Sequence, residues 1–125
     1  MEKIKELFVV IEDRPKAFGE MLSVLAKGNI YIETLAAFVD SAKLIVREVE
    51  KAQKLLGEHN YVTEVREVIR TKVTNKSKEL AYIAERIGHV GINISYIYGM
   101  TKPGDKEITL IMDVSDVDTA LSLFK

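Results

Sequence analysis

Two short segments of the chain place polar side chains directly before apolar residues with helical spacing. Their residues are Asp13, Arg14, Pro15, Lys16 and Ala17 in the first segment, and Asn75, Lys76, Ser77 and Lys78 in the second. The first turn of a helix presents unpaired backbone N–H groups and the positive end of the helix dipole, which together suit the carboxylate of an amino acid. The side chain of Asp13 could pair with the ammonium group of the same molecule. Both segments are therefore candidate binding sites for a small molecule.

The same residues also have a purely structural interpretation. Asp and Asn before a helix commonly accept hydrogen bonds from its first N–H groups, so Asp13 and Asn75 could serve only as helix caps. Basic side chains in such positions are more often solvated than bound to a ligand. Four of them are present: Arg14, Lys16, Lys76 and Lys78.

No constellation of residues supports catalysis or a metal site. His59 and His89 are the only histidines, cysteine is absent and no carboxylates cluster at ligand spacing, so we expect neither a metal nor a cofactor. The serines lack a nucleophile elbow, and there is no P-loop or Gly-x-Gly-x-x-Gly phosphate cradle. Tyr96 and Tyr98 could stack nucleic-acid bases, but the basic Gly-aromatic motif that accompanies such rings is missing, and we expect both to pack beneath helices. The chain is therefore not expected to be an enzyme.

The elements that would position the two segments occur twice. Residues 7–38 and 69–100 align without a gap at a constant offset of 62 positions. The matched pairs include Ile11 with Val73, Met21 with Ile83 and Ile30 with Ile92. Because each copy must satisfy the same burial pattern, we expect two modules, residues 1–67 and 68–125. A module of about 60 residues buries only ~60% of its unfolded surface, so each should rest on the other or on a second chain.

The hydrophobic pattern of the first copy predicts six elements in the order βαββαβ. Runs of β-branched residues and strict alternation indicate strands, and apolar residues at helical spacing indicate helices. The expected strands are 7–11, 30–38, 44–46 and 61–66, and the expected helices are 18–25, ended by Gly28, and 49–56, before Gly57. This order is typical of ferredoxin-like α+β folds, in which helices cover one face of an antiparallel sheet.

The second copy follows with almost no linker and repeats most of this order. Its expected strands are 69–73, 92–98 and 108–112, and its expected helices are 80–87 and 117–124. Nothing in it corresponds to residues 61–66. We therefore expect the second sheet to lack its last strand, which would leave residues 69–73 as an unpaired edge.

The motifs around the two segments resemble those of the ACT domain family. They are Asp13-Arg14-Pro15 before the first helix and Gly91-Ile92-Asn93-Ile94 at the second strand of the second copy. The resemblance covers nearly the whole chain, as a tandem ACT protein. It implies ferredoxin-like regulatory modules that bind amino acids or similar metabolites, often where two modules meet side by side. It also adds Asn93 and Ile94 to the candidate ligand-binding residues.

The chain departs from the family pattern at three positions. Where the family usually has Gly after Pro, this chain has Lys16 in the first copy and Lys78 in the second, and Ser77 replaces the Pro of the second copy. The added lysines favour a more anionic ligand. We expect a non-catalytic regulatory or sensor protein whose effector is an amino acid or a related anionic metabolite. The alternative is an interaction subunit that binds no ligand and regulates a separate metabolic enzyme.

Charge and hydropathy indicate where the protein is located and which partners are not expected. A net charge of -1 and a pI near 6.1 give no reason to expect binding to nucleic acid or to an anionic membrane. No apolar run approaches the ~20 residues that span a bilayer, and no signal peptide is recognisable, so a cytoplasmic protein is expected.

Phe8, Val10 and Ile45 alternate with the core residues of their strands, which puts apolar side chains on both faces of the first sheet. This second apolar face and the unpaired edge predict a homodimer.

Overall fold

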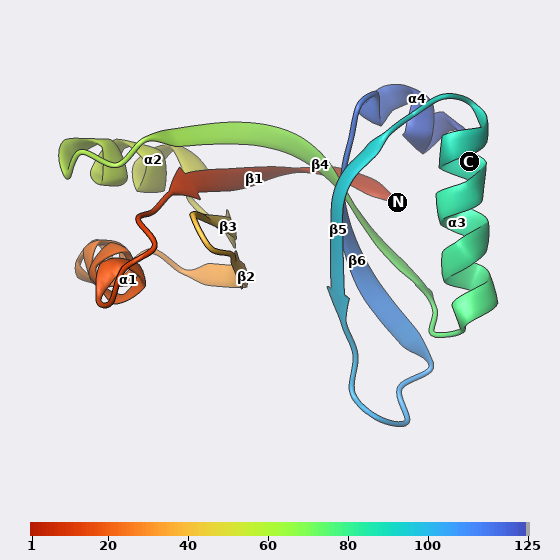
Figure 1. The fold of residues 1–125 in the computed structure, drawn as a ribbon, viewed down its shortest axis with the longest axis horizontal. Coiled ribbons are helices and arrows are strands. Elements are labelled where there is room, and N and C mark those ends of the chain that lie inside the picture. The colour runs from red at the N-terminus through yellow and green to blue at the C-terminus, as the bar shows by residue number, and fades with distance from the viewer. Residues whose placement is uncertain (125) are drawn as a thin grey trace. The chain divides into compact units, whose positions relative to one another are not determined.

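Residues 1–124, which the computed structural model describes, fold into six strands and four helices (Figure 1). In chain order these are β1 (Glu2–Val10), α1 (Ala17–Lys27), β2 (Ile32–Ala37), β3 (Ser41–Val46), α2 (Val49–Glu58), β4 (Thr63–Thr74), α3 (Ser77–His89), β5 (Ile94–Met100), β6 (Glu107–Val114) and α4 (Val117–Ser122). The strand order is β2-β3-β1-β4-β6-β5. The expected α+β class is confirmed.

The chain divides into two compact units. One comprises residues 5–66, and the other comprises residues 1–4 with the chain from Glu67 onward. β1 and β4 therefore each contribute to both units. β4 runs unbroken from Thr63 to Thr74, where the sequence predicted two separate strands. No glycine, proline or other turn-forming residue interrupts this stretch, which accounts for its continuity.

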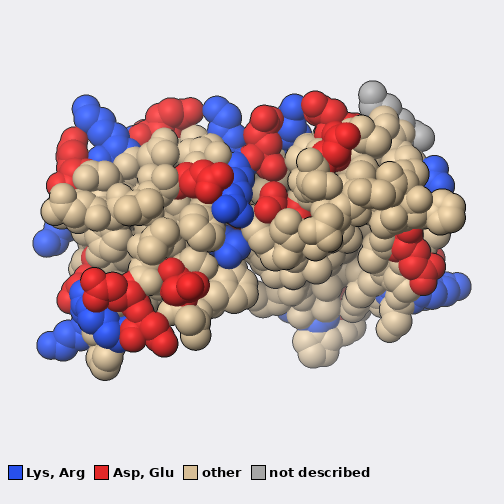
Figure 2. Space-filling model, turned by 45° about the horizontal axis from the view of Figure 1, so that its top comes forward, with Lys and Arg blue, Asp and Glu red and all other residues tan. Residues whose placement is uncertain are grey.

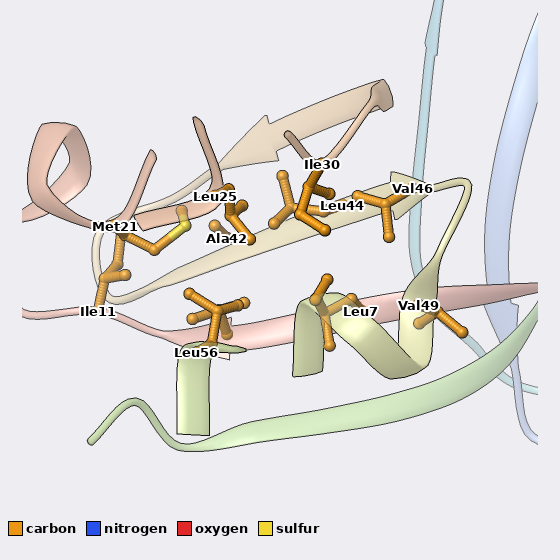
Figure 3. Packing of buried hydrophobic residues seen from close by; sticks show 12 residues of the cluster. Leu7, Ile11, Met21, Leu25, Ile30, Ala42, Leu44, Val46, Val49 and Leu56 are labelled. Atoms are coloured by element: carbon orange, nitrogen blue, oxygen red, sulfur yellow. The ribbon is translucent and has the colours of Figure 1, made fainter. Parts of the chain in front are cut away.

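In residues 5–66, α1 and α2 pack on one face of the strands (Figure 3). Cross-strand pairing places Leu7 opposite Leu44 and Val9 opposite Ala42, so these four side chains share that face. The helices contribute Met21, Leu25, Val49, Ala52 and Leu56 to the same cluster. The apolar faces predicted for both helices are confirmed, because their most buried residues form this core.

The opposite face of these strands carries cations over aromatic rings. Lys43 is only 7% exposed, and its Nζ lies 5.0 Å from the centroid of the Phe8 ring and 4.4 Å from that of Phe38. The guanidinium of Arg66 lies 4.6 Å from the Phe8 ring. Such contacts cover an aromatic face while the charge remains attracted to the ring quadrupole. Since Ile45 is also buried, the expectation of an uncovered apolar face is wrong for Phe8 and Ile45.

In the other unit, α3 and α4 pack on β4 and β6. The buried cluster consists of Ile69, Ile83, Ile87, Ile92, Met112, Val114 and Ala120. Its strand members meet across the sheet, where Ile69 lies opposite Met112. The helical spacing of Ile83 and Ile87 explains why α3 turns this side toward the strands.

The strand that the second copy was expected to lack is supplied by the start of β1. β1 is the neighbour of β4 on the side away from β6, and Arg70 Nε donates to Glu2 Oε1 at 2.8 Å. Further along, Val10 N–H donates to the carbonyl of Val62, so the two strands run antiparallel. The prediction of an edge at residues 69–73 was therefore wrong. The sequence misled because residues 2–6 are mostly charged and lie more than 60 positions from the strand they pair with.

The two stacked tyrosines lie on the face away from the helices. Tyr98 is paired with Ile111, whereas the core residue Met112 points to the opposite face. The Tyr96 and Tyr98 rings stack with their centroids 6.4 Å apart. The prediction that they pack beneath helices was wrong because the register shifts between Ile94 and Tyr96, which reverses the alternation of the strand.

Charged side chains of both signs are interspersed on the face that Figure 2 shows. This face therefore carries no extended basic surface of the kind that nucleic-acid binding requires. No helix within residues 1–124 is long and apolar enough to cross a membrane.

Candidate functional site

A hollow of about 430 Å³ lies beside the loop that joins β1 to α1. It belongs entirely to residues 5–66. Its lining, called here the loop hollow, consists of Val10, Ile11, Glu12, Arg14, Ala17, Glu20, His59, Asn60, Tyr61 and Val62. One wall is the end of β1 with the start of α1, and the other is the turn from α2 to β4. Its size lies within the range of sites that take small organic ligands, ~300 to 1,000 Å³.

Backbone hydrogen bonds hold the two walls together. Val10 N–H donates to the carbonyl of Val62 at 3.0 Å, which ties β1 to the start of β4. Asn60 adopts a left-handed conformation with φ of 67°, and Tyr61 N–H donates back to the carbonyl of Leu56. Asn tolerates this conformation better than most residues, so α2 ends here and the chain turns into the wall.

Arg14 carries the only guanidinium in the lining, and this group is hydrogen-bonded to other residues of the same loop and helix. Its Nε donates to Glu12 Oε2 at 2.7 Å, and its Nη2 and Nη1 donate to the two Glu20 carboxylate oxygens at 2.9 and 3.4 Å. Nη1 also donates to the Pro15 carbonyl at 3.2 Å. The hydrogen bonds with Glu20, followed by the one with Glu12, raise the pKa of Arg14. The same bonds from Arg14 lower the pKa of Glu20. Arg14 thus braces the loop against the first turn of α1.

The start of α1 is strained and lacks a side-chain cap. Lys16 occupies the N-cap position with φ of 74° and ψ of -19°, a left-handed conformation that favours glycine. No side chain accepts a hydrogen bond from the first turn of α1. The interpretation of Asp13 as a helix cap is therefore wrong. The loop keeps the backbone shape of a glycine at a position where this chain has lysine.

The corresponding segment of the second copy has a different shape. α3 begins at Ser77, so Lys78, the counterpart of Lys16, lies inside the helix rather than in a left-handed turn. The N-cap residue Lys76 is extended, and no side chain caps α3, so Asn75 is not a cap either. Asn75 N–H instead donates to the carbonyl of Lys106 at 2.9 Å, which ties this loop to the β5–β6 hairpin.

Only part of the predicted set of ligand-binding residues comes together. Arg14 and Ala17 line the loop hollow, and Lys16 lines an adjoining hollow of about 540 Å³ along α1 that shares Glu20 and His59 with it. The remaining first-copy residues, Asp13 and Pro15, lie in the loop outside both linings. The candidates of the second copy belong to the other compact unit: Asn75, Lys76, Ser77, Lys78, Asn93 and Ile94.

Asn93 is engaged with a neighbouring turn. Its N–H donates to Ser115 Oγ at 3.0 Å, and its carbonyl accepts from Ser115 N–H at the same distance. These bonds join the start of β5 to the end of β6. The backbone of Asn93 therefore has a structural role.

Several lining residues were not anticipated from the sequence. Glu20 lies six positions after Arg14, and no sequence motif predicts an interaction between residues at that spacing. The residues from the α2–β4 turn, His59 to Val62, are remote in sequence from the loop and reach it through strand pairing. The only sequence signal for that wall was the pair His59-Asn60 after a predicted helix, which indicates a turn. Within residues 1–124, no group of three or more His, Asp or Glu side chains is placed to hold a metal ion.

No protein-family model matches the sequence. No curated protein sequence matches it either. Solved structures do match its fold. The protein BT0572 from Bacteroides thetaiotaomicron aligns over 97% of this chain and 85% of its own, with 23% identity and a TM-score of 0.83.

The fold is also shared by the regulatory subunit of one aspartate kinase and by part of a second aspartate kinase. The ligand-free regulatory subunit of aspartate kinase from Thermus thermophilus aligns over 98% of this chain and 94% of its own, with 14% identity and a TM-score of 0.65. E. coli aspartokinase III, in complex with lysine and aspartate, aligns over 99% of this chain and 32% of its own, with 16% identity and a TM-score of 0.56. At these identities the likeness concerns the fold, and it supports an ACT-like fold for this chain.

Proposed function

We propose that this chain is a non-catalytic regulatory protein that binds an amino acid in the loop hollow. The observation that carries the proposal is the position of this hollow, beside the uncapped start of α1, in a fold shared with the regulatory subunit of an aspartate kinase. The first N–H groups of an uncapped helix suit a carboxylate. Val10, Ile11 and Tyr61 supply an apolar wall for a side chain.

We place the site in the first copy rather than the second. The left-handed turn at Lys16 separates the loop from the helix and leaves the start of α1 facing the hollow. In the second copy, α3 begins two positions earlier relative to the repeat, and the loop is fastened to a hairpin. The second-copy residues, including Asn93 and Ile94, therefore serve the fold in this proposal.

The alternative is an interaction subunit that binds no ligand and acts on a separate enzyme. The observation in its favour is the likeness over nearly the full length of a chain that is itself a regulatory subunit.

We also propose a homodimer. β2 and β5 stand at the two ends of the strand order, and each carries an exposed apolar side chain at matching repeat positions, Leu35 at 43% and Ile97 at 46% exposure. Such edges are stabilised by pairing with another strand.

A thermal-shift screen of the twenty amino acids tests the proposal. A ligand at 100 times its Kd adds about 2.7 kcal/mol to the free energy of unfolding, which raises the Tm by roughly 10 °C in a chain of this size. Val62→Trp fills the loop hollow from a side chain that is 68% exposed and should abolish the shift. Val39→Trp is the matched control, because Val39 is 69% exposed and lies outside the lining.

Each outcome of the screen has a clear meaning. A shift that Val62→Trp removes and Val39→Trp preserves supports a site in the loop hollow. A shift that survives Val62→Trp places the site elsewhere. If no amino acid raises the Tm, the interaction subunit becomes the better account.

A further inference from the structure

Glu20 accepts hydrogen bonds from both terminal nitrogens of the Arg14 guanidinium, a pair of donors that suits a carboxylate. We propose that Glu20 sets the charge selectivity of the loop hollow: by holding Arg14, it prevents a second carboxylate from forming a bidentate pair with the guanidinium. The hollow then takes amino acids with neutral or cationic side chains and discriminates against acidic ones. This inference rests on the proposed function and specifies its ligand class.

The geometry leaves Arg14 no free edge for a carboxylate. A guanidinium binds a carboxylate most strongly through two parallel N–H donors, and Arg14 already uses Nη1 and Nη2 on Glu20. Its Nε is directed to Glu12, so the adjacent edge is also taken. A ligand side-chain carboxylate could form a bidentate pair with Arg14 only by displacing one of these two carboxylates.

The charges around the hollow also disfavour a second carboxylate on the ligand. Its lining holds two carboxylates, Glu12 and Glu20, against the single charge of Arg14, and His59 is the remaining titratable side chain apart from Tyr61. The hydrogen bonds and charge of Arg14, and to a smaller extent the charge of Lys16 in the adjoining hollow, lower the pKa of Glu20 and favour its ionised form. The hollow therefore repels a second ligand carboxylate, contrary to the more anionic ligand that the lysines suggested.

The pair can be broken without unfolding the chain. The side chains of Arg14 and Glu20 are 44% and 50% exposed, and ion pairs this exposed contribute little to folding stability. Glu20→Gln keeps the shape of the side chain and removes its charge. Glu50→Gln is the matched control, because Glu50 lies in the first turn of α2, pairs with Lys5 at 3.4 Å and does not line the hollow.

Calorimetric titration with isosteric pairs of amino acids tests the inference. The pairs are L-aspartate with L-asparagine and L-glutamate with L-glutamine, measured alongside any other amino acid that binds. We expect the wild-type protein and Glu50→Gln to bind the amides at least about tenfold more tightly than the acids, a difference typical of one charge-assisted hydrogen bond. Glu20→Gln should gain affinity for the acids by a similar factor.

The inference is overturned if the wild-type protein binds an acid as tightly as its amide, or if Glu20→Gln gains no affinity for either acid while some amino acid still binds. In both cases amino-acid binding itself would stand. If neither the wild-type protein nor Glu20→Gln binds any amino acid, the proposed function fails and this inference falls with it.

Discussion

Lys16 sits in a left-handed conformation that glycine adopts more easily, so Lys16→Gly should stabilise the protein. At φ of 74° the Cβ atom of a non-glycine residue costs about 1 to 2 kcal/mol. Removing the side chain also gives the unfolded chain more freedom, which costs about 0.5 to 1 kcal/mol. The net expectation is a gain of roughly 0.5 to 1 kcal/mol in the free energy of unfolding.

Replacing lysine with glycine inside a helix should instead lower the free energy of unfolding. Lys54 lies exposed in the middle of α2, where glycine is less favourable than lysine by roughly 0.7 kcal/mol. Lys54→Gly is therefore the matched control for loss of a lysine. Together the two variants should differ by about 1.5 kcal/mol, or on the order of 5 °C in Tm.

Urea unfolding of both variants and of Lys16→Ala measures these differences. Lys16→Ala retains the Cβ atom and should remain within about 0.5 kcal/mol of the wild type. If Lys16→Gly destabilises the protein as much as Lys54→Gly does, the left-handed turn carries no strain, and the account of this loop is wrong.

Two further predictions concern the ends of the chain. Deleting residues 1–4 should remove hydrogen-exchange protection from the amides of residues 68–71 that face β1, while β3 stays protected. Lys3→Ala, which loses only the ion pairs to Glu67 and Asp118, should keep this protection. Equal protection in the deletion variant would contradict the pairing of β1 with β4. Asp116 caps α4 by accepting hydrogen bonds from the backbone N–H and the hydroxyl of Thr119. These bonds lower the pKa of Asp116 in the folded protein. The ionised carboxylate therefore stabilises the fold above its unfolded pKa, and this stabilisation is lost as the pH falls through the lower folded pKa. The stability difference between the wild type and Asp116→Asn, measured by urea unfolding, should therefore shrink on acidification below about pH 4, and a constant difference would refute it.

Local patterns were sufficient for most elements of the fold. Helical spacing located α1 and α3 and the residues they bury, such as Met21, Leu25 and Ile87, because burial on one face dictates that spacing. Alternation located the strands but failed where the register shifts between Ile94 and Tyr96. A bulge is set by how two strands fit together, and the sequence of one strand does not reveal it.

Non-local pairing limited what the sequence could reveal of the fold and the site. The charged segment at residues 2–6 becomes a strand because β4 offers it an edge, not because of its own propensity. The turn at His59 and Asn60 joins the site for a similar reason, through the bond between Val10 and Val62. The loop at residues 13–17 was found from its position before a helix, but its partners across the hollow were not.

The two copies also show how one pattern yields two different loops. Pro15 and Lys16 precede α1, and the left-handed turn at Lys16 delays the helix until Ala17. In the second copy Ser77 takes the place of Pro15, and the helix begins at that residue and carries Lys78 within it. Serine has the backbone N–H and the free φ that proline lacks. The matched lysines therefore lie in different surroundings: Lys16 lines the hollow along α1 beside Glu20, whereas Lys78 lies within a helical turn. A charge pattern shared by two copies is thus weak evidence for a shared ligand, and the different backbone at Lys16 and Lys78 is the better reason to place binding in the first copy.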